Sequence, residues 1–258
     1  MVYSKEYTVT NSEMDSEYRL TPVGASMFFQ DCFASFMTRY HLASFDLRSL
    51  GLMWIITEYS IRFEASVPFW SEKIRVDIWL SSLTSVKARL DYKMVHRGVV
   101  FAKGDCVWSM LESETRKPVI VKERLLNVPI LPETVLGGFR HIIPETSALL
   151  GVYRHTLDGS DTDFNYHVNN VTYLRVCIDA IEAEFKKNHR LSFFTIKFLQ
   201  ESFCGQELAC SVYSTEMPQD RVLRLFSGND CENCRAYMEF QEFNSTGSIL
   251  DYSLLTRE

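Results

Sequence analysis

The pattern of apolar and polar positions predicts a helix followed by several strands in the first part of the chain. Thr21 and Pro22 favour a helix start, and apolar or aromatic residues then recur at helical spacing as far as Tyr40. From Trp54 to Leu111, β-branched and aromatic residues alternate with polar ones, and turn residues interrupt the run. These segments indicate one helix packed on a curled antiparallel sheet.

The same order of elements returns in the second part. Residues 124–138 contain two prolines and two glycines, so we predict a linker there. A strand over 152–157, a helix from Asn169 to about residue 187 and four strands between 193 and 243 are expected to follow. A shift of 148 residues aligns Asp15 with Asp163, and a shift of 135 aligns Ser60 with Thr195. We therefore predict two related domains, residues 1–123 and 139–258.

Three polar residues alternate immediately before the second predicted helix. Asp163, Asn165 and His167 would lie on one side of an extended segment. Asn169 is a suitable N-cap, and a helix N-terminus offers unpaired N–H groups and about half a positive charge. This spacing predicts an oxyanion site with a carboxylate, an amide and an imidazole beside it.

The run DFNYHVNNVTY, from Asp163 to Tyr173, resembles the signature of the acyl-[acyl-carrier-protein] thioesterases of bacteria and plant plastids. The segments Gly51-x-x-Trp54 and Thr115-Arg116-Lys117-Pro118 are also similar to that family, and the resemblance extends over nearly the whole chain. It implies an α+β fold of two tandem hot-dog domains, each a long helix wrapped by a curled antiparallel sheet, which together form an internal pseudo-dimer. The first domain would then supply an acyl-chain pocket, for which the helix offers Met27, Phe28, Phe33 and Met37.

The resemblance implies hydrolysis of fatty acyl thioesters of acyl carrier protein (ACP), with release of the free fatty acid and without a cofactor or metal. It makes Asp163, Asn165, His167 and Glu201 the expected catalytic residues. The backbone N–H groups of Val168 and Asn169 are the expected oxyanion donors. Sequence leaves open whether Asp163 or Glu201 is the base or nucleophile. Plant members carry a cysteine next to the acid, whereas Ser202 stands there in this chain and Cys204 comes later, which argues against a thiol nucleophile.

Charge and composition limit the classes of molecule that this protein is expected to bind. A net charge of -6 with scattered basic residues argues against nucleic acid, and no apolar run is long enough to span a membrane. Seven cysteines without a secretion signal indicate reduced thiols and a cytoplasmic, bacterial protein, and the lone CxxC at Cys231 does not complete a metal site. A homodimer remains open. An acidic carrier would dock on basic residues, for which we name Lys186, Lys187, Arg190 and Lys197.

Three alternatives stay open at the level of sequence. A hot-dog dehydratase pairs a histidine with an acid across a dimer but lacks the Asn-x-His-Val-Asn-Asn run. An acyl-coenzyme A (CoA) thioesterase would use the same residues on another carrier. A non-catalytic acyl-binding protein would not need the complete set of polar residues that the second half retains. The preferred acyl chain length is not readable from the sequence.

Overall fold

The computed structural model describes residues 1–137, 141–163, 167–228 and 231–242. The elements of the first half are β1 (Tyr3–Thr8), α1 (Pro22–Thr38), α2 (Ser44–Arg48), β2 (Leu52–Phe63), β3 (Lys73–Leu83), β4 (Ala88–His96), β5 (Val99–Glu112) and α3 (Val121–Arg124). Those of the second half are β6 (Leu149–Thr156), the 3-10 turn η1 (Gly159–Asp161), α4 (Asn170–Ala180), α5 (Ala183–Asn188), β7 (His189–Phe198), β8 (Glu207–Ser214), β9 (Arg221–Ser227) and β10 (Cys231–Glu242).

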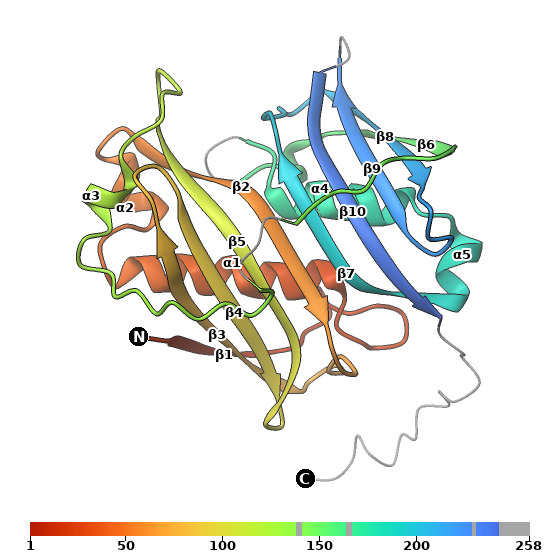
Figure 1. The fold of residues 1–258 in the computed structure, drawn as a ribbon, viewed down its shortest axis with the longest axis horizontal. Coiled ribbons are helices and arrows are strands. Elements are labelled where there is room, and N and C mark those ends of the chain that lie inside the picture. The colour runs from red at the N-terminus through yellow and green to blue at the C-terminus, as the bar shows by residue number, and fades with distance from the viewer. Residues whose placement is uncertain (138–140, 164–166, 229–230, 243–258) are drawn as a thin grey trace.

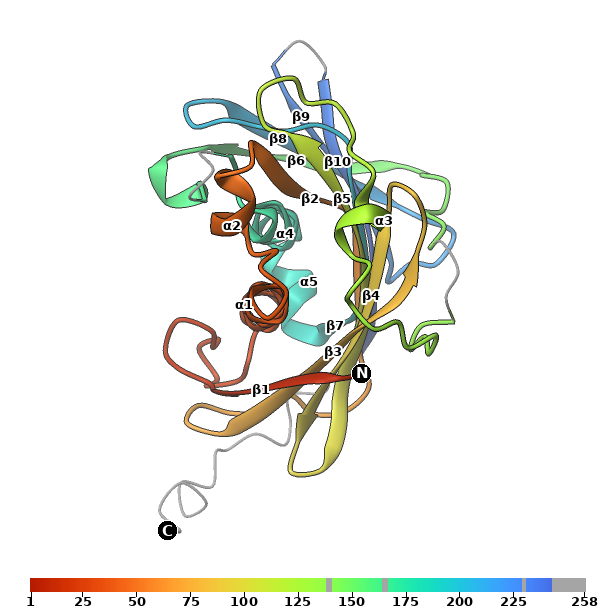
Figure 2. The ribbon, with the colours of Figure 1, turned by 90° about the vertical axis from the view of Figure 1, so that its left-hand side faces the viewer.

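One continuous antiparallel sheet curls around α1 and α4 in the described part of the chain (Figures 1 and 2). Its strand order is β1-β3-β4-β5-β2-β7-β10-β9-β8-β6. Each half of the chain therefore builds one half of the sheet, with its own edge strand and its own helix. Burial of the aromatic side of α1 anchors the first helix, where Phe33 stacks on Trp108 of β5 at 4.0 Å between ring centroids.

The two halves meet where β2 pairs with β7. Ser60 stands opposite Thr195 in this register, and the Ser60 hydroxyl donates to Thr195 Oγ1 at 2.9 Å in a fully buried setting. Glu58 pairs with Lys197, and Arg62 pairs with Phe193. Because the shift of 135 residues makes Ser60 and Thr195 equivalent, the internal two-fold relation runs through this pair. The predicted fold, two tandem hot-dogs in an internal pseudo-dimer, is confirmed.

The predicted first helix is confirmed, and the second is corrected. Thr21 accepts a hydrogen bond from Gly24 N–H at 3.0 Å with Pro22 at the first helical position, as the sequence indicates. In the second half the helix does not continue to residue 187. The chain becomes extended at Ile181 (ψ 134°), so α4 ends and the short α5 starts in a new direction. Periodicity missed this break because Ile181 and Phe185 still fit a helical spacing.

The segment that joins the halves crosses the face of the sheet opposite the helices (Figure 2). Leu131 N–H donates to the Leu80 carbonyl at 2.9 Å, and the Trp79 indole donates to the Glu133 carbonyl at 2.8 Å. The domain boundaries at residues 123 and 139 stay a prediction. No helix in the described ranges has both the length and the apolar character needed to cross a membrane.

Candidate active site

Residues at the start and at the end of the motif before α4 pair with each other, and the middle of the predicted extended segment lies outside the described residues. Thr162 and Val168 pair as an antiparallel bridge, and Asp163 N–H donates to the His167 carbonyl at 2.8 Å. His167 N–H faces Asp163 Oδ1 at 3.4 Å. The two ends of the motif therefore lie side by side. Asn165, the predicted amide of the site, lies outside the described residues.

The first half contains the same loop at the position given by the shift of 148 residues. Met14 and Leu20 form the corresponding bridge, and Asp15 N–H donates to the Arg19 carbonyl at 2.8 Å. In both halves the N-cap residue also donates its backbone N–H to the backbone carbonyl of a buried acidic residue, from Thr21 to Glu13 and from Asn169 to Asp161, each at 2.8 Å. The internal repeat thus includes the loop that presents the candidate catalytic residues.

The start of α4 corrects the predicted oxyanion donors. Val168 N–H donates to the Ser202 carbonyl at 3.3 Å, and Asn169 N–H donates to the Asp161 carbonyl at 2.8 Å. Both groups are therefore occupied by backbone acceptors, which the sequence could not show. The Asn169 side chain caps Val171 N–H at 3.0 Å, which confirms the predicted N-cap. No described acceptor contacts the backbone N–H of Asn170, the first residue of α4.

The side chains of His167 and Glu201 meet beside this helix start, and Arg116 joins them. His167 Nε2 lies 3.8 Å from Glu201 Oε2. The Arg116 guanidinium contacts both residues, with Nη2 2.8 Å from His167 Nε2 and Nη1 3.3 Å from Glu201 Oε1. The His167 side chain is 14% exposed and that of Glu201 34%, so the group opens to solvent on one side. The resemblance to the family assigns His167 and Glu201 to one site, whereas Arg116 has no predicted role there.

In the corresponding loop of the first half, the charged side chains form ion pairs with one another. Arg19, at the position equivalent to His167, pairs with Glu17 and lies 3.7 Å from Asp15. Arg190 of the second half reaches Glu17 at 3.4 Å. An arginine surrounded by carboxylates cannot accept a proton as a base, because the guanidinium keeps its charge. Of the two repeats, the second is therefore the one that places an imidazole beside a carboxylate.

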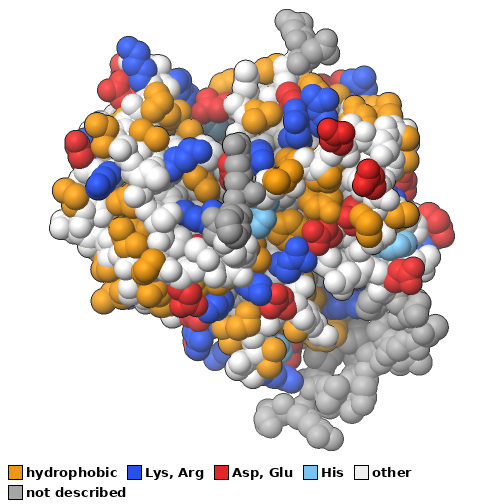
Figure 3. Space-filling model, viewed as in Figure 1, with side chains coloured by type: hydrophobic (Ala, Val, Ile, Leu, Met, Phe, Trp, Pro, Cys, Tyr) orange, Lys and Arg blue, Asp and Glu red, His pale blue; other side chains and the backbone are white. Residues whose placement is uncertain are grey.

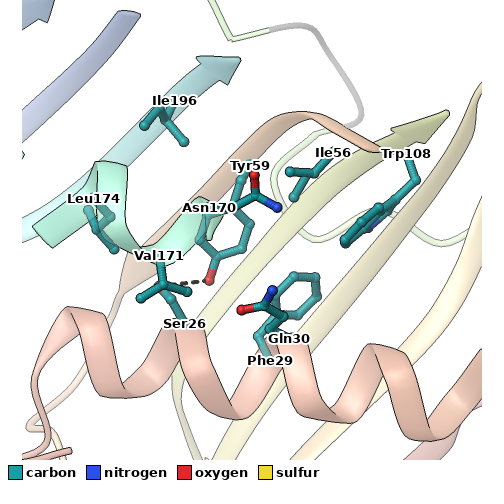
Figure 4. Close-up of a pocket in the computed structure, with 10 residues that line it drawn as sticks. All are labelled: Ser26, Phe29, Gln30, Ile56, Tyr59, Trp108, Asn170, Val171, Leu174 and Ile196. Carbon is teal, nitrogen blue, oxygen red and sulfur yellow. Dashed lines mark hydrogen bonds between the residues drawn. The ribbon is translucent and has the colours of Figure 1, made fainter. Parts of the chain in front are cut away.

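An apolar pocket lies next to the start of α4, between α1 and α4 (Figure 4). Its volume is about 20 Å³. Residues of both halves line it, namely Ser26, Phe29, Gln30, Ile56, Tyr59, Trp108, Asn170, Val171, Leu174 and Ile196. Met27, Phe28, Phe33 and Met37, which we expected on the acyl pocket, are absent from this lining. Met27 is 43% exposed, and Phe33 stacks on the ring of Trp108, which does line the pocket.

Three of the four basic residues predicted to dock a carrier protein lie at the other end of α4 from His167. Lys186, Lys187 and Arg190 follow the C-terminal end of α4, whereas His167 precedes its N-terminal end. A helix of 11 residues is about 16 Å long. Lys197 lies within β7, opposite Glu58 of β2. On the face shown in Figure 3, acidic and basic side chains are interspersed.

Two helices, each wrapped by half of one curled sheet, define a double hot-dog protein. The chain belongs to the acyl-ACP thioesterase family. The model of the acyl-ACP thioesterase N-terminal domain matches residues 1–128, and that of the C-terminal domain matches residues 154–242. Together they cover both hot-dog halves, including the motif before α4.

Known relatives and solved structures agree with this assignment. The chain is 25% identical over 219 residues to oleoyl-acyl carrier protein thioesterase 2 of Arabidopsis thaliana, a match that covers 78% of this chain and 56% of that protein. It is 23% identical over 176 residues to a palmitoyl-acyl carrier protein thioesterase of Gossypium hirsutum, covering 61% and 40%. The chain thus spans about half the length of the curated relatives it matches.

Two solved structures share the fold over nearly their full length. An acyl-ACP thioesterase from Bacteroides thetaiotaomicron superposes with a TM-score of 0.81 at 18% identity, covering 93% of this chain and 98% of that one. The 12:0-ACP thioesterase from Umbellularia californica gives 0.81 at 15% identity, covering 94% and 98%.

Proposed function

We propose that this protein hydrolyses the thioester of fatty acyl-ACP and releases the free fatty acid. The observation that carries the proposal is the meeting of His167 and Glu201 at the start of α4, directly beside an apolar pocket. The relatives named above act, by their names, on oleoyl- and palmitoyl-ACP. Membership of that family supports the same substrate class here, and a cytoplasmic bacterial setting is part of this proposal.

The acyl chain would lie in the pocket between α1 and α4. Phe29, Trp108 and Leu174 supply apolar walls, and the Tyr59 hydroxyl donates to Oγ of Ser26, another lining residue, at 3.2 Å (Figure 4). A cavity of about 20 Å³ holds about one water molecule. Binding a fatty acyl chain therefore requires lining side chains to move apart. Because both halves line the pocket, each hot-dog would contribute to chain recognition.

Glu201 is the general base of the proposed reaction. The carboxylate takes a proton from a water molecule as the water oxygen attacks the thioester carbonyl carbon, and His167 helps to orient that water. The tetrahedral intermediate then collapses, the carbon–sulfur bond breaks, and Glu201 returns the proton to the departing thiolate. Asp163 closes the loop that presents His167. General-base catalysis of this kind contributes roughly a hundred- to ten-thousand-fold.

Asn170 supplies the proposed oxyanion donor in place of Val168 and Asn169. Its backbone N–H is the first of α4, where the helix dipole favours negative charge. Its side chain also lines the pocket, so the thioester carbonyl would lie between the pocket and the helix start (Figure 4). One such donor contributes about 3 kcal/mol to the transition state.

The proposal is tested by assaying purified protein with acyl-ACP and acyl-CoA that carry the same fatty acid. Release of free thiol is measured at several substrate concentrations. We expect a higher kcat/KM for the ACP thioester. An equal or higher value for the CoA thioester would instead make the protein an acyl-CoA thioesterase. Tight binding of acyl-ACP without thiol release would indicate a non-catalytic acyl-binding protein.

A further inference from the structure

The candidate site contains a residue of the opposite half, Arg116, that the proposed reaction leaves without a role. Arg116 follows β5, 51 positions before His167 and 85 before Glu201. Its guanidinium contacts the side chains of both. The group is 40% exposed, so it lies at the opening of the site and not in its core.

The backbone at Arg116 is held in an unusual conformation. Its φ is +58°, a region that residues other than glycine rarely adopt. Hydrogen bonds fix this turn to the end of β5, from Arg116 N–H to the Glu112 carbonyl and from Glu112 N–H to the Lys117 carbonyl, both at 3.0 Å. The Thr115 hydroxyl adds a bond to the Glu112 carboxylate at 2.6 Å. The side chain therefore leaves a rigid turn of the first half and reaches into the second.

Glu201 has a fixed backbone and a side chain that depends on this arginine. The Asn233 side chain donates to the Glu201 carbonyl at 3.1 Å, and the next residue, Ser202, accepts from Val168 N–H. These bonds position the main chain. The side-chain contacts of Glu201 with other described residues are those with Arg116 and His167. Arg116 thus determines where the carboxylate points.

The contact with His167 also determines the tautomer of the imidazole. A guanidinium has donors and no acceptor, so His167 Nε2 must accept the hydrogen bond from Arg116 Nη2. The neutral ring then carries its proton on Nδ1, because the partner of one ring nitrogen decides which of them is protonated. Arg116 accordingly holds the ring and the carboxylate in a single arrangement.

We propose that Arg116 is a positioning residue that the first hot-dog supplies to the active site of the second. It fixes the Glu201 carboxylate and the His167 tautomer, so the site is complete only when both halves are present. This inference rests on the proposed hydrolase function. The basic character of Arg116 alone does not explain these contacts, since Lys117 on the same turn is exposed and makes no ion pair with a described residue.

Arg116→Gly is the most informative variant, with Lys117→Ala as its matched control. Glycine tolerates a positive φ, so the turn should persist and the melting temperature should stay near that of the wild type. We expect kcat to fall about tenfold to a hundredfold on both acyl-ACP and acyl-CoA, with little change in KM. Guanidinium at millimolar concentration should partly restore the kcat of Arg116→Gly, whereas sodium chloride at the same ionic strength should not. Lys117→Ala should behave as the wild type.

An NMR measurement tests the same inference without using activity. The six histidines are labelled with ¹⁵N, and His167 is assigned with His167→Ala. At about pH 8, where an ordinary histidine is neutral, we expect Nδ1-protonated His167 in the wild type and a shift towards Nε2 protonation in Arg116→Gly. An Nε2-protonated His167 in the wild type would overturn the inference. So would an equal rise in KM for acyl-ACP alone in Arg116→Gly and Lys117→Ala, which would indicate carrier docking. A wild type without turnover but with the expected tautomer would refute the hydrolase proposal and leave the Arg116 contact established.

Discussion

At the scale of single residues, the site is defined by which hydrogen-bonding groups are already engaged. Val168 and Asn169 donate their backbone N–H groups to carbonyls, which leaves the start of α4 to Asn170. His167 and Glu201 meet through their side chains, so one carboxylate faces the imidazole directly. Asp163 instead faces the His167 backbone. The proximity of the Glu201 carboxylate to the imidazole supports our proposal that Glu201 is the base.

Cys204 provides a prediction at this scale. Its thiol is free and exposed in the loop between β7 and β8, three residues after Glu201. We expect Cys204→Ala to keep turnover within about twofold, because surface substitutions away from the chemistry have small effects. Steady-state hydrolysis of acyl-ACP checks this, with Glu201→Gln prepared in parallel as the inactive reference. A folded Cys204→Ala variant without activity would restore the thiol as nucleophile.

The motif allowed Asp163, His167 and Glu201 to be predicted, and the contacts of Arg116 could not be. The first three lie in a recognisable run or at a family position, so sequence alone brings them together. Arg116 reaches His167 only because β5 ends next to the loop of the other half, and this depends on the register across β2 and β7. The occupied oxyanion donors were missed for a similar reason, since backbone acceptors leave no mark in the sequence.

At the scale of elements, β9 and β10 share one partly buried carboxylate, Glu232, that lies between two arginines. Glu232 accepts from Arg224 Nε at 2.7 Å and from Arg235 Nη2 at 2.7 Å, where β10 has an irregular register. Burial raises the pKa of Glu232, but the hydrogen bonds and charges of the two arginines outweigh it and lower the pKa from 4.5 to about 2. The ionised carboxylate therefore stabilises the folded state.

Glu232→Gln should lower the free energy of unfolding by about 1–3 kcal/mol at neutral pH, because two arginines lose their shared acceptor. The folded-state pKa is depressed, so this stabilisation is present above the unfolded-state value of 4.5 and is lost as the pH falls towards about 2. Urea denaturation of both proteins at about pH 7 and about pH 3 measures the difference. The exposed Glu216 serves as control through Glu216→Gln. A difference that does not shrink at low pH would contradict this reading.

Periodicity and turn residues located the strands and α1 because each alternates or repeats over many residues. They failed at the end of α4, where Ile181 keeps its place in the apolar stripe although its backbone is extended. What changes the direction there is tertiary packing. Phe185 of α5 stacks on the His189 ring at 3.9 Å between centroids, and the Arg221 guanidinium lies over the Phe185 ring, 4.1 Å from its centroid. Such long-range partners are not visible in a local pattern.

At the scale of the whole molecule, the seam between β2 and β7 makes the two halves one structure. The weak internal repeat in the sequence predicted two related domains, and the equivalent residues Ser60 and Thr195 do meet at the seam. The sequence could not show that the two sheets merge into one, because strand pairing between distant segments depends on the complete fold. The pocket and the Arg116 contacts both span this seam.

The hydroxyl pair at the seam should behave as a coupled unit. Ser60→Ala and Thr195→Val should each lower the free energy of unfolding by about 1–2 kcal/mol, because each leaves the other buried hydroxyl without its partner. The double variant should lose less than the sum, with a coupling of at least about 0.5 kcal/mol. Chemical denaturation of the wild type, the two single variants and the double variant completes this double-mutant cycle. Strictly additive losses would mean that the pair does not join the halves.

The most direct measurement compares acyl-ACP hydrolysis by the wild type, His167→Ala and Arg19→Ala. His167 and Arg19 occupy equivalent positions in the two repeats, so the pair separates the candidate active half from its counterpart. We expect at least about a hundredfold loss of turnover in His167→Ala, with the circular dichroism and melting temperature of a folded protein, and nearly unchanged turnover in Arg19→Ala. Full turnover in folded His167→Ala, or an equal loss in both variants, would contradict a hydrolytic site confined to the loop before α4.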